Sequence, residues 1–381
     1  MITAPSRSVT GHRQVFRVDV VLVFAALLAA SIGVIMVYSA TRGNLLAQGL
    51  DPHYFLKRQA LFVMIGIVAM VVAALIDYRR IESVGMLVYG LLVLALLGVL
   101  VPGVGSHVLG SARWFSLGPL QIQPSEFAVI ALIIAVATYC SRRSEGLTWK
   151  DVIKVLVLAG IPVLLVMKQP DLGTAIIMMI VLLAMLAVAG VPGRVLVILV
   201  VVGAVSVVLA LKVGLLHQYQ LNRLTTFLHQ DSHNPALQGS IYNVNQAKIA
   251  IGSGGLWGKG FLHGAQTNLG YVPFQQTDFI FTAVGEQLGF VGATVVLAIL
   301  GIIAWRILRA AQLARDSFGR LLCAGIFTFF AYSVFQNAGM TMGIMPITGI
   351  PLPFLSYGGS AALVFFIGVG IALSVYARRA A

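Results

Sequence analysis

Two carboxylates stand out because they lie beside or within a strongly apolar segment. Asp278 follows Thr277 and directly precedes the apolar run Phe279-Ile-Phe281, and Glu286 lies eight residues after Asp278. Eight residues are a little over two helical turns, so both side chains would point in a similar direction, roughly 12 Å apart. Ionisable groups in membrane segments are costly and therefore indicate function. The pattern predicts an aqueous cavity beside this segment, with a helix-capping role for Asp278 as the alternative.

Other polar residues lie at the starts of apolar segments. Glu126 follows Gln-Pro-Ser, and Asp171 follows Lys-Gln-Pro. Both suit a helix N-terminus, Asp171 as a cap and Glu126 in the first turn. The run Pro351-Leu-Pro-Phe-Leu-Ser-Tyr-Gly-Gly-Ser360 cannot continue a helix. It predicts either a structured turn or a wall of the cavity, in which Ser356 and Tyr357 would donate hydrogen bonds.

The composition excludes a soluble protein. The chain has 381 residues, of which 59% are hydrophobic and only 10% are charged, whereas soluble domains are about a quarter charged. The net charge is +13, but the basic residues are spread over short segments between apolar runs. This distribution fits topology signals in membrane lipid and argues against nucleic acid as a partner. The two cysteines, Cys140 and Cys323, form neither a disulfide framework nor a metal-ligand motif.

Ten apolar segments are long enough, or nearly so, to cross a membrane as helices. They lie at residues 18–39, 59–76, 84–101, 124–140, 152–167, 171–190, 194–213, 278–305, 319–343 and 361–378. We therefore predict an all-α, polytopic integral membrane protein. Residues 1–381 would form one membrane-embedded domain, since neither an internal repeat nor a soluble domain is apparent.

Basic residues concentrate at alternate ends of these segments. Placing the N-terminus in the cytoplasm puts most of the 25 Lys and Arg residues on the cytoplasmic side, as the positive-inside rule requires. An even number of spans then puts both termini inside and the long segment over residues 213–277 outside. A loop of this length is usually functional or disordered, and we expect it to fold against the outer face of the bundle.

A glycine-rich stretch, Ile251–Gly260, lies in this long segment and carries Lys259. It is superficially similar to a phosphate cradle, but it lacks the spacing of a nucleotide-binding P-loop. No nucleotide is expected outside the cytoplasm. A diphosphate attached to a lipid is therefore the more suitable anion.

Taken together, the motifs resemble those of the SEDS family, the polytopic polymerases of bacterial cell-wall glycan, over nearly the full length of the chain. The matching motifs are Val37-Tyr-Ser-Ala40, Arg113-Trp114, Gln123-Pro-Ser-Glu126, Gln169-Pro-Asp-Leu-Gly-Thr-Ala175, Ile249-Ala-Ile-Gly-Ser-Gly-Gly-Leu256, Gly258-Lys-Gly260, Thr277-Asp-Phe-Ile-Phe281 and Pro351–Ser360. Any one motif is weak evidence, whereas the set in family order is specific. Gly339–Pro346 and the Lys168 motif favour the elongation branch of the family over its division branch.

The resemblance implies a glycosyltransferase that joins the disaccharides of lipid II through β-1,4 bonds and releases undecaprenyl diphosphate. The essential Asp of the family motif corresponds to Asp278, which would act as general base. An ordinary Asp pKa of about 3.9 is low for a base; burial would raise this pKa, whereas a helix N-terminus would lower it. Arg58, Arg113, Arg223 and Lys259 are candidates for holding the diphosphate. The further residues expected to bind substrate are Glu126, Asp171, Thr277, Glu286, Ser356 and Tyr357.

The resemblance also implies partners and a location. Members of the family work with a class B penicillin-binding protein, a single-span transpeptidase, and with other proteins of the elongation complex. The location implied is the bacterial cytoplasmic (inner) membrane, with the active site facing outside and a role in cell elongation and shape. No cofactor is required by the motifs, and a divalent cation (Mg²⁺ or Mn²⁺) at the carboxylates is left open.

Three positions depart from the family pattern. Val129 replaces the usual Lys three residues after Glu126, Gln276 replaces a His, and Gln287 replaces a second Glu. The change at Val129 matters most because residues i and i+3 are neighbours on a helix. This change favours one alternative, a non-catalytic scaffold for the transpeptidase. A lipid II flippase, which would use the same cavity and anion-binding residues but no base, also stays open. A small-molecule transporter is disfavoured by the lack of repeated halves.

Overall fold

Long apolar stretches form helices because a helix satisfies its own backbone hydrogen bonds. The structure, a computed structural model, describes residues 18–101, 105–108, 111–117, 120–143, 146–213, 218–228, 230 and 238–379. Its long helices are α1 (Val20–Ala47), α2 (Tyr54–Leu75), α3 (Tyr78–Leu100), α4 (Pro124–Ser141), α5 (Trp149–Lys168), α6 (Leu172–Val188), α7 (Gly193–Val213), α11 (Ile280–Gln312), α12 (Ser317–Thr341) and α13 (Gly359–Ala377). Each overlaps one of the ten predicted segments.

Seven of these helices, namely α1, α2, α3, α4, α11, α12 and α13, are long and apolar enough to cross a membrane. Helix α6 and residues 193–206 of α7 are shorter apolar helices. A crossing by all ten helices stays a prediction.

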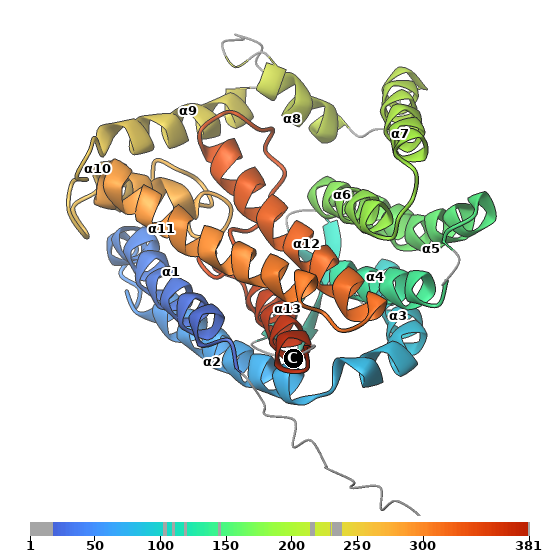
Figure 1. Cartoon of the computed structure of the whole chain (residues 1–381). Helices are drawn as coiled ribbons and strands as arrows, with labels where there is room; N and C mark the ends of the chain where they lie inside the picture. The colour runs from blue at the N-terminus through green and yellow to red at the C-terminus, as the bar shows by residue number, and fades with distance from the viewer. Residues whose placement is uncertain are drawn as a thin grey trace, which may run out of the picture.

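Helices α13 and α4 are the most buried of the seven candidate spans, and α13 lies near the middle of the bundle (Figure 1). Helix α2 packs closely along α13 because small residues lie at their contact. A Cβ added at Gly370 would lie 2.4 Å from the Met70 carbonyl oxygen, and one added at Gly66 would lie 2.3 Å from the Phe366 ring. Such small residues let membrane helices approach each other.

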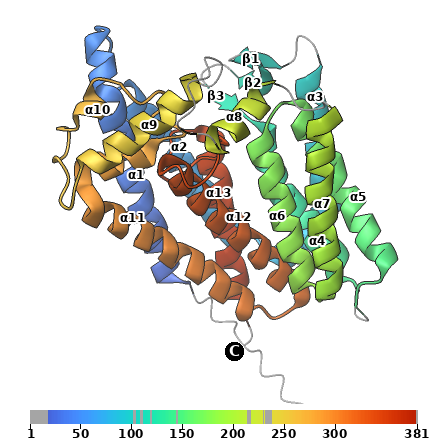
Figure 2. The same ribbon diagram turned by 90° about the horizontal axis from the view of Figure 1, so that it is seen from above.

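Short elements gather at one end of the long helices, which we call the loop face (Figure 2). They are α8 (Gln218–Leu228), α9 (Gln238–Ser253), α10 (Ala265–Asn268), β1 (Ser106–Val108), β2 (Ser111–Leu117) and β3 (Leu120–Ile122). The strands form an antiparallel sheet in the order β1-β2-β3, with Phe115 opposite Ile122. The all-α prediction therefore missed a small sheet between α3 and α4. The C-terminus lies at the other end of the bundle.

Helix α11 begins two residues later than predicted, and this changes the reading of Asp278. The helix starts at Ile280 with Phe279 as its N-cap residue, so the alternative that Asp278 caps this helix is wrong. Asp171, in contrast, caps α6 by accepting a hydrogen bond from Thr174 N at 3.2 Å, as expected. Glu126 lies in the first turn of α4, also as expected.

A kink in α11 is formed together with the glycine-rich stretch. Gly289 has a φ of 66° inside the helix, and a Cβ there would lie 2.2 Å from Gly258 N. The Lys259 and Gly260 amides donate to carbonyls of Glu286 and Gln287 at 3.0 Å each. The backbone of this stretch thus pairs with the helix, and these amides do not cradle a phosphate.

Candidate functional site

The segment at residues 276–278 lies on the loop face immediately before α11 and is fixed through three successive carbonyl groups. The Tyr357 amide donates to the first carbonyl at 2.8 Å, the Ser356 hydroxyl donates to the second, and the Asn337 side chain donates to the third at 2.8 Å. A chain held at each residue has little freedom to rotate. The side chain of Asp278 is thereby presented in a fixed direction.

Two buried amides in apolar helices complete this support. Asn337 of α12 is fully buried and donates also to the Ile350 carbonyl at 2.9 Å. Gln59 of α2 is fully buried as well and donates to the Ser356 carbonyl at 3.2 Å. Neither amide was predicted, because apolar segments were searched for charges only. The presence of an uncharged amide within an apolar segment is the sequence signal that could have identified both residues.

Asp278 lies close to cationic groups. A Cβ added at Gly349 would lie 3.4 Å from Asp278 Oδ2 and 4.0 Å from Arg223 Nη1, so both groups flank this glycine. Burial raises the pKa of the Asp278 carboxyl above its ordinary value. The nearby Arg223 and Arg113 lower this pKa, whereas Asp171 raises it. The effect of burial is the largest, so the pKa is raised, and this is the direction required of a general base.

Asp171 joins two helices at the edge of this cluster. Its Oδ2 accepts hydrogen bonds from Ser125 Oγ at 3.0 Å and from Thr174 Oγ1 at 2.9 Å. Arg113, on β2, donates to the Pro170 carbonyl at 2.6 Å, and its buried Nε has no hydrogen-bond partner among the described residues. Asp171 therefore fastens α4 to α6, while Arg113 keeps an unused donor.

Glu126 is half-buried, and the charged groups close enough to interact with it are Asp171 and Asp278. In the described part of the chain no hydrogen bond or ion pair reaches its carboxylate. Val129, one turn further along α4, is packed in the hydrophobic core with 1% of its surface exposed. The three carboxylates thus lie near one another, and the cation expected beside Glu126 is absent from the described residues.

Glu286 and Lys259 lie apart from this cluster. The Glu286 carboxylate is fully buried and accepts hydrogen bonds from Gln266 N at 2.8 Å and from Thr267 N and Oγ1 at 3.0 and 2.7 Å. It therefore holds α10 against α11. The expectation that it shares a cavity with Asp278 is wrong, because Asp278 precedes the helix and helical spacing does not apply to it. The Lys259 side chain is exposed at the kink of α11.

Arg58 and Tyr357 lie on the α2 side of the 276–278 segment. Arg58 donates to Tyr54 Oη at 2.7 Å and contacts the face of that ring, with its guanidinium carbon 5.4 Å from the centroid. Tyr357 packs edge-on against Phe55, with 5.0 Å between ring centroids. The Ser356 hydroxyl, which was expected to meet substrate, is buried and engaged with the backbone. Ser356 thus acts on Asp278 through the main chain.

The described acidic side chains of the site are not arranged to chelate a metal ion. Within the described residues, no group of three His, Cys, Asp or Glu side chains is placed to hold a metal ion. The carboxylates of Glu126, Asp171 and Asp278 are neighbours without forming a chelating set. The positive charge of the site comes from Arg113 and Arg223.

The fold and the site define a class: a multi-span membrane protein with a fixed carboxylate beside arginines at one end of its bundle. A family model described as "cell cycle protein", which covers FtsW, RodA and SpoVE, matches residues 19–380. The chain therefore belongs to this family, the SEDS family.

Individual relatives come from several branches. The peptidoglycan glycosyltransferase MrdB of Escherichia coli is 40% identical over 317 residues, covering 83% of this chain and 84% of its own. The probable peptidoglycan glycosyltransferase FtsW of Trichlorobacter lovleyi is 36% identical, covering 94% and 93%. Stage V sporulation protein E of Bacillus subtilis is 37% identical, covering 94% and 96%.

Solved structures agree with these relatives. A chain of a peptidoglycan synthase complex, in which polymerization and crosslinking are coordinated, matches with a TM-score of 0.79 and 29% identity over 94% of this chain and 97% of its own. The rod shape determining protein RodA of Thermus thermophilus, as an Asp-to-Ala mutant, matches with a TM-score of 0.69 and 28% identity over 95% and 98%. The multi-span bundle is thus shared with solved members of the family.

Proposed function

We propose that this peptidoglycan glycosyltransferase polymerises lipid II, with Asp278 as general base. The observation that carries the proposal is the fixation of Asp278: its backbone is held at three successive carbonyls, and its carboxylate lies beside two arginines. Positioning and a pKa raised toward the working pH are the two requirements of a general base.

The reaction follows from these groups. The acceptor hydroxyl attacks the anomeric carbon of the donor sugar while its proton passes to Asp278. The bond from that carbon to the diphosphate oxygen breaks, and undecaprenyl diphosphate leaves. Arg113 and Arg223 would stabilise the charge that develops on the leaving diphosphate.

The cellular setting is part of the proposal. The loop face would lie outside the bacterial cytoplasmic membrane, with both termini in the cytoplasm, as the charge distribution indicates. A class B penicillin-binding protein would be the partner; the likeness to a synthase complex that combines polymerization and crosslinking supports this. The Gly339–Pro346 motif supports an elongation role of the RodA type, with other elongation-complex proteins nearby.

Polymerisation of labelled lipid II by the purified protein tests the proposal. The parent and Asp278→Ala would be assayed alone and with the transpeptidase partner, with glycan strands resolved by length. We expect strands from the parent and none from the variant. The proposal fails if the parent makes no strands although the partner is shown to bind.

A scaffold without activity is the second candidate, because Glu126 has like charges and no described cation around it. The variant Val129→Lys distinguishes the two functions. If the missing cation has silenced the enzyme, Val129→Lys would polymerise lipid II where the parent does not. If the parent is already active, the scaffold function is excluded.

A further inference from the structure

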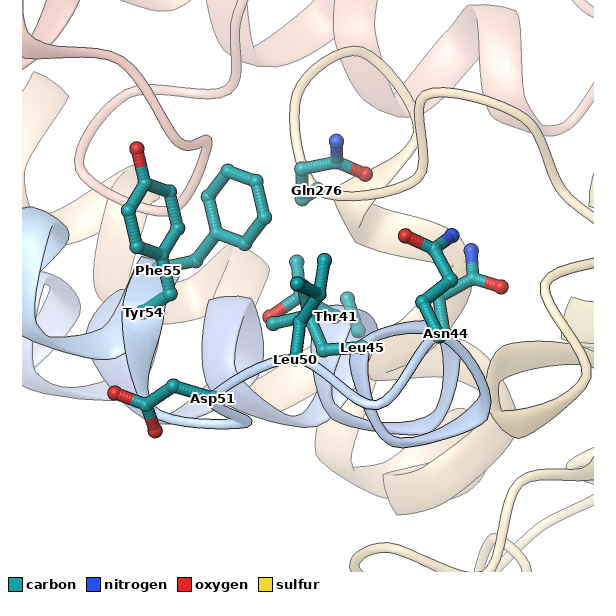
Figure 3. Close-up of a pocket in the computed structure, with 10 residues that line it drawn as sticks. Thr41, Asn44, Leu45, Leu50, Asp51, Tyr54, Phe55 and Gln276 are labelled. Atoms are coloured by element: carbon teal, nitrogen blue, oxygen red, sulfur yellow. The ribbon is translucent and has the colours of Figure 1, made fainter.

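A pocket of about 580 Å³ opens where α1 ends and α2 begins. Figure 3 shows that its walls come from the last turns of α1, the connection between the two helices, the start of α2 and, from the opposite side, Gln276. Its volume is in the range of sites for small molecules.

The lining combines apolar with polar residues, and its one charged residue is Asp51. Asn44, Gln48 and Gln276 contribute primary amides, and no hydrogen bond from these side chains occurs to any other described residue. Each amide offers two donors and an acceptor. Tyr54 and Phe55 add aromatic rings on the α2 wall (Figure 3). The lining thus offers both hydrogen-bond donors and acceptors, together with the apolar surface of the rings.

The one carboxylate of the lining, Asp51, is already paired with a cation. Asp51 accepts hydrogen bonds from His53 N and Lys57 Nζ at 2.9 Å each. These contacts lower the pKa of Asp51, so it stays ionised and paired with Lys57. A charged ligand group would therefore find no unpaired opposite charge in the lining. The pocket suits an uncharged ligand rich in hydroxyl and amide groups.

The pocket adjoins the reacting centre. Gln276 precedes Asp278 by two residues, a separation of at most about 7 Å along the chain. The arginines that act on the Asp278 carboxylate, Arg113 and Arg223, are not among the lining residues. Arg113 and Arg223 thus lie outside the pocket, whereas the two cations on the pocket side, Lys57 and Arg58, are engaged with Asp51 and Tyr54.

We propose that this pocket binds the saccharide units of the growing glycan strand. The inference rests on the proposed function and assigns a place to the uncharged part of its substrate. A strand whose diphosphate lies at Arg113 and Arg223 and whose anomeric carbon lies at Asp278 would continue past Gln276 into the pocket. Its hydroxyl and acetamido groups would meet the three amides, and its sugar rings would pack on Tyr54 and Phe55.

Binding of a lipid-free β-1,4-linked N-acetylglucosamine tetramer to the purified protein is the first test. The variant carries Gln48→Ala and Gln276→Ala, and its matched control is Gln312→Ala, an exposed glutamine at the other end of α11. We expect the tetramer to bind the parent and Gln312→Ala equally, and the double variant about tenfold more weakly, from the loss of two neutral hydrogen bonds. Equal binding to all three proteins, or none to the parent, would overturn the proposal.

Strand length is the second test. The double variant would make shorter strands than Gln312→Ala at equal thermal stability, and it would do so equally with lipid II that lacks its stem peptide. A defect confined to lipid II with the stem would place the peptide in the pocket and refute the saccharide assignment. Asp278→Ala keeps the two proposals apart, because it should bind the tetramer and make no strands. A parent that binds the tetramer but makes no strands contradicts the proposed function alone.

Discussion

At the scale of single residues, the reactivity of Asp278 depends on opposing influences. Burial raises its pKa, and the guanidinium groups of Arg223 and Arg113 lower it. The proposed general base acts only when it is ionised, so we expect activity to be lost as the pH falls through this raised pKa. The acid limb of the rate profile should accordingly lie above the ordinary Asp value of about 3.9.

Removal of a guanidinium should move that limb in a defined direction. In Arg223→Gln the pKa of Asp278 loses an influence that lowers it, so the midpoint of the acid limb should shift to higher pH. Initial rates of lipid II polymerisation between mildly acidic and neutral pH measure this midpoint separately from any loss of binding. Arg309→Gln, at the far end of α11, is the control and should leave the midpoint in place. A shift to lower pH would contradict the electrostatic account.

Asn337 is a positioning residue because its amide holds the Asp278 carbonyl. Asn337→Leu should lower kcat by on the order of 100-fold, since small displacements of a catalytic group are this costly, while KM changes little. The matched control is Gln336→Leu, which removes a hydrogen bond to Pro346 O from the neighbouring buried amide. If both variants lose activity only in proportion to thermal stability, Asn337 has a structural role alone.

At the scale of elements, the kink in α11 exists because two glycines let the chain cross the helix closely. Gly289→Ala would place a Cβ 2.2 Å from Gly258 N at a positive φ. We expect a loss of stability of at least about 2 kcal/mol, read as a lower melting temperature in detergent. Gly252→Ala, on α9 with open space around it, should cost nothing or stabilise by up to about 1 kcal/mol. Equal melting temperatures would show that the close approach is unimportant.

The elements also show what the sequence could predict. The ten long helices could be located because continuous apolar runs determine them locally. The N-cap role of Asp171 and the first-turn position of Glu126 could be predicted from the residues next to them in the sequence. The burial of Glu286 under α10 could not be predicted, since it depends on a loop that folds back over twenty residues. The strands near Arg113 were missed because they are short and lack a clear alternation. Likewise, Asn337 reaches Asp278 only through tertiary packing.

At the scale of the whole molecule, the bundle separates two polar ends. The loop face carries the site and the exposed Trp257, whereas the other end carries caps and ion pairs such as Arg306 with Asp19 at 2.6 Å. The positive-inside rule predicts that the second end faces the cytoplasm. This orientation decides whether the site meets lipid II after its translocation.

Labelling with a membrane-impermeant maleimide determines the orientation. Trp257→Cys has a position that is 80% exposed beside the kink of α11, and Arg315→Cys lies exposed just beyond the end of that helix. In intact spheroplasts we expect Trp257→Cys to be labelled and Arg315→Cys to react only after permeabilisation. The native Cys140 and Cys323 are buried, so the parent gives the background. Labelling of Arg315→Cys alone in intact spheroplasts would turn the site toward the cytoplasm, where a polymerase of exported glycan has no substrate, and would thereby exclude the proposed function.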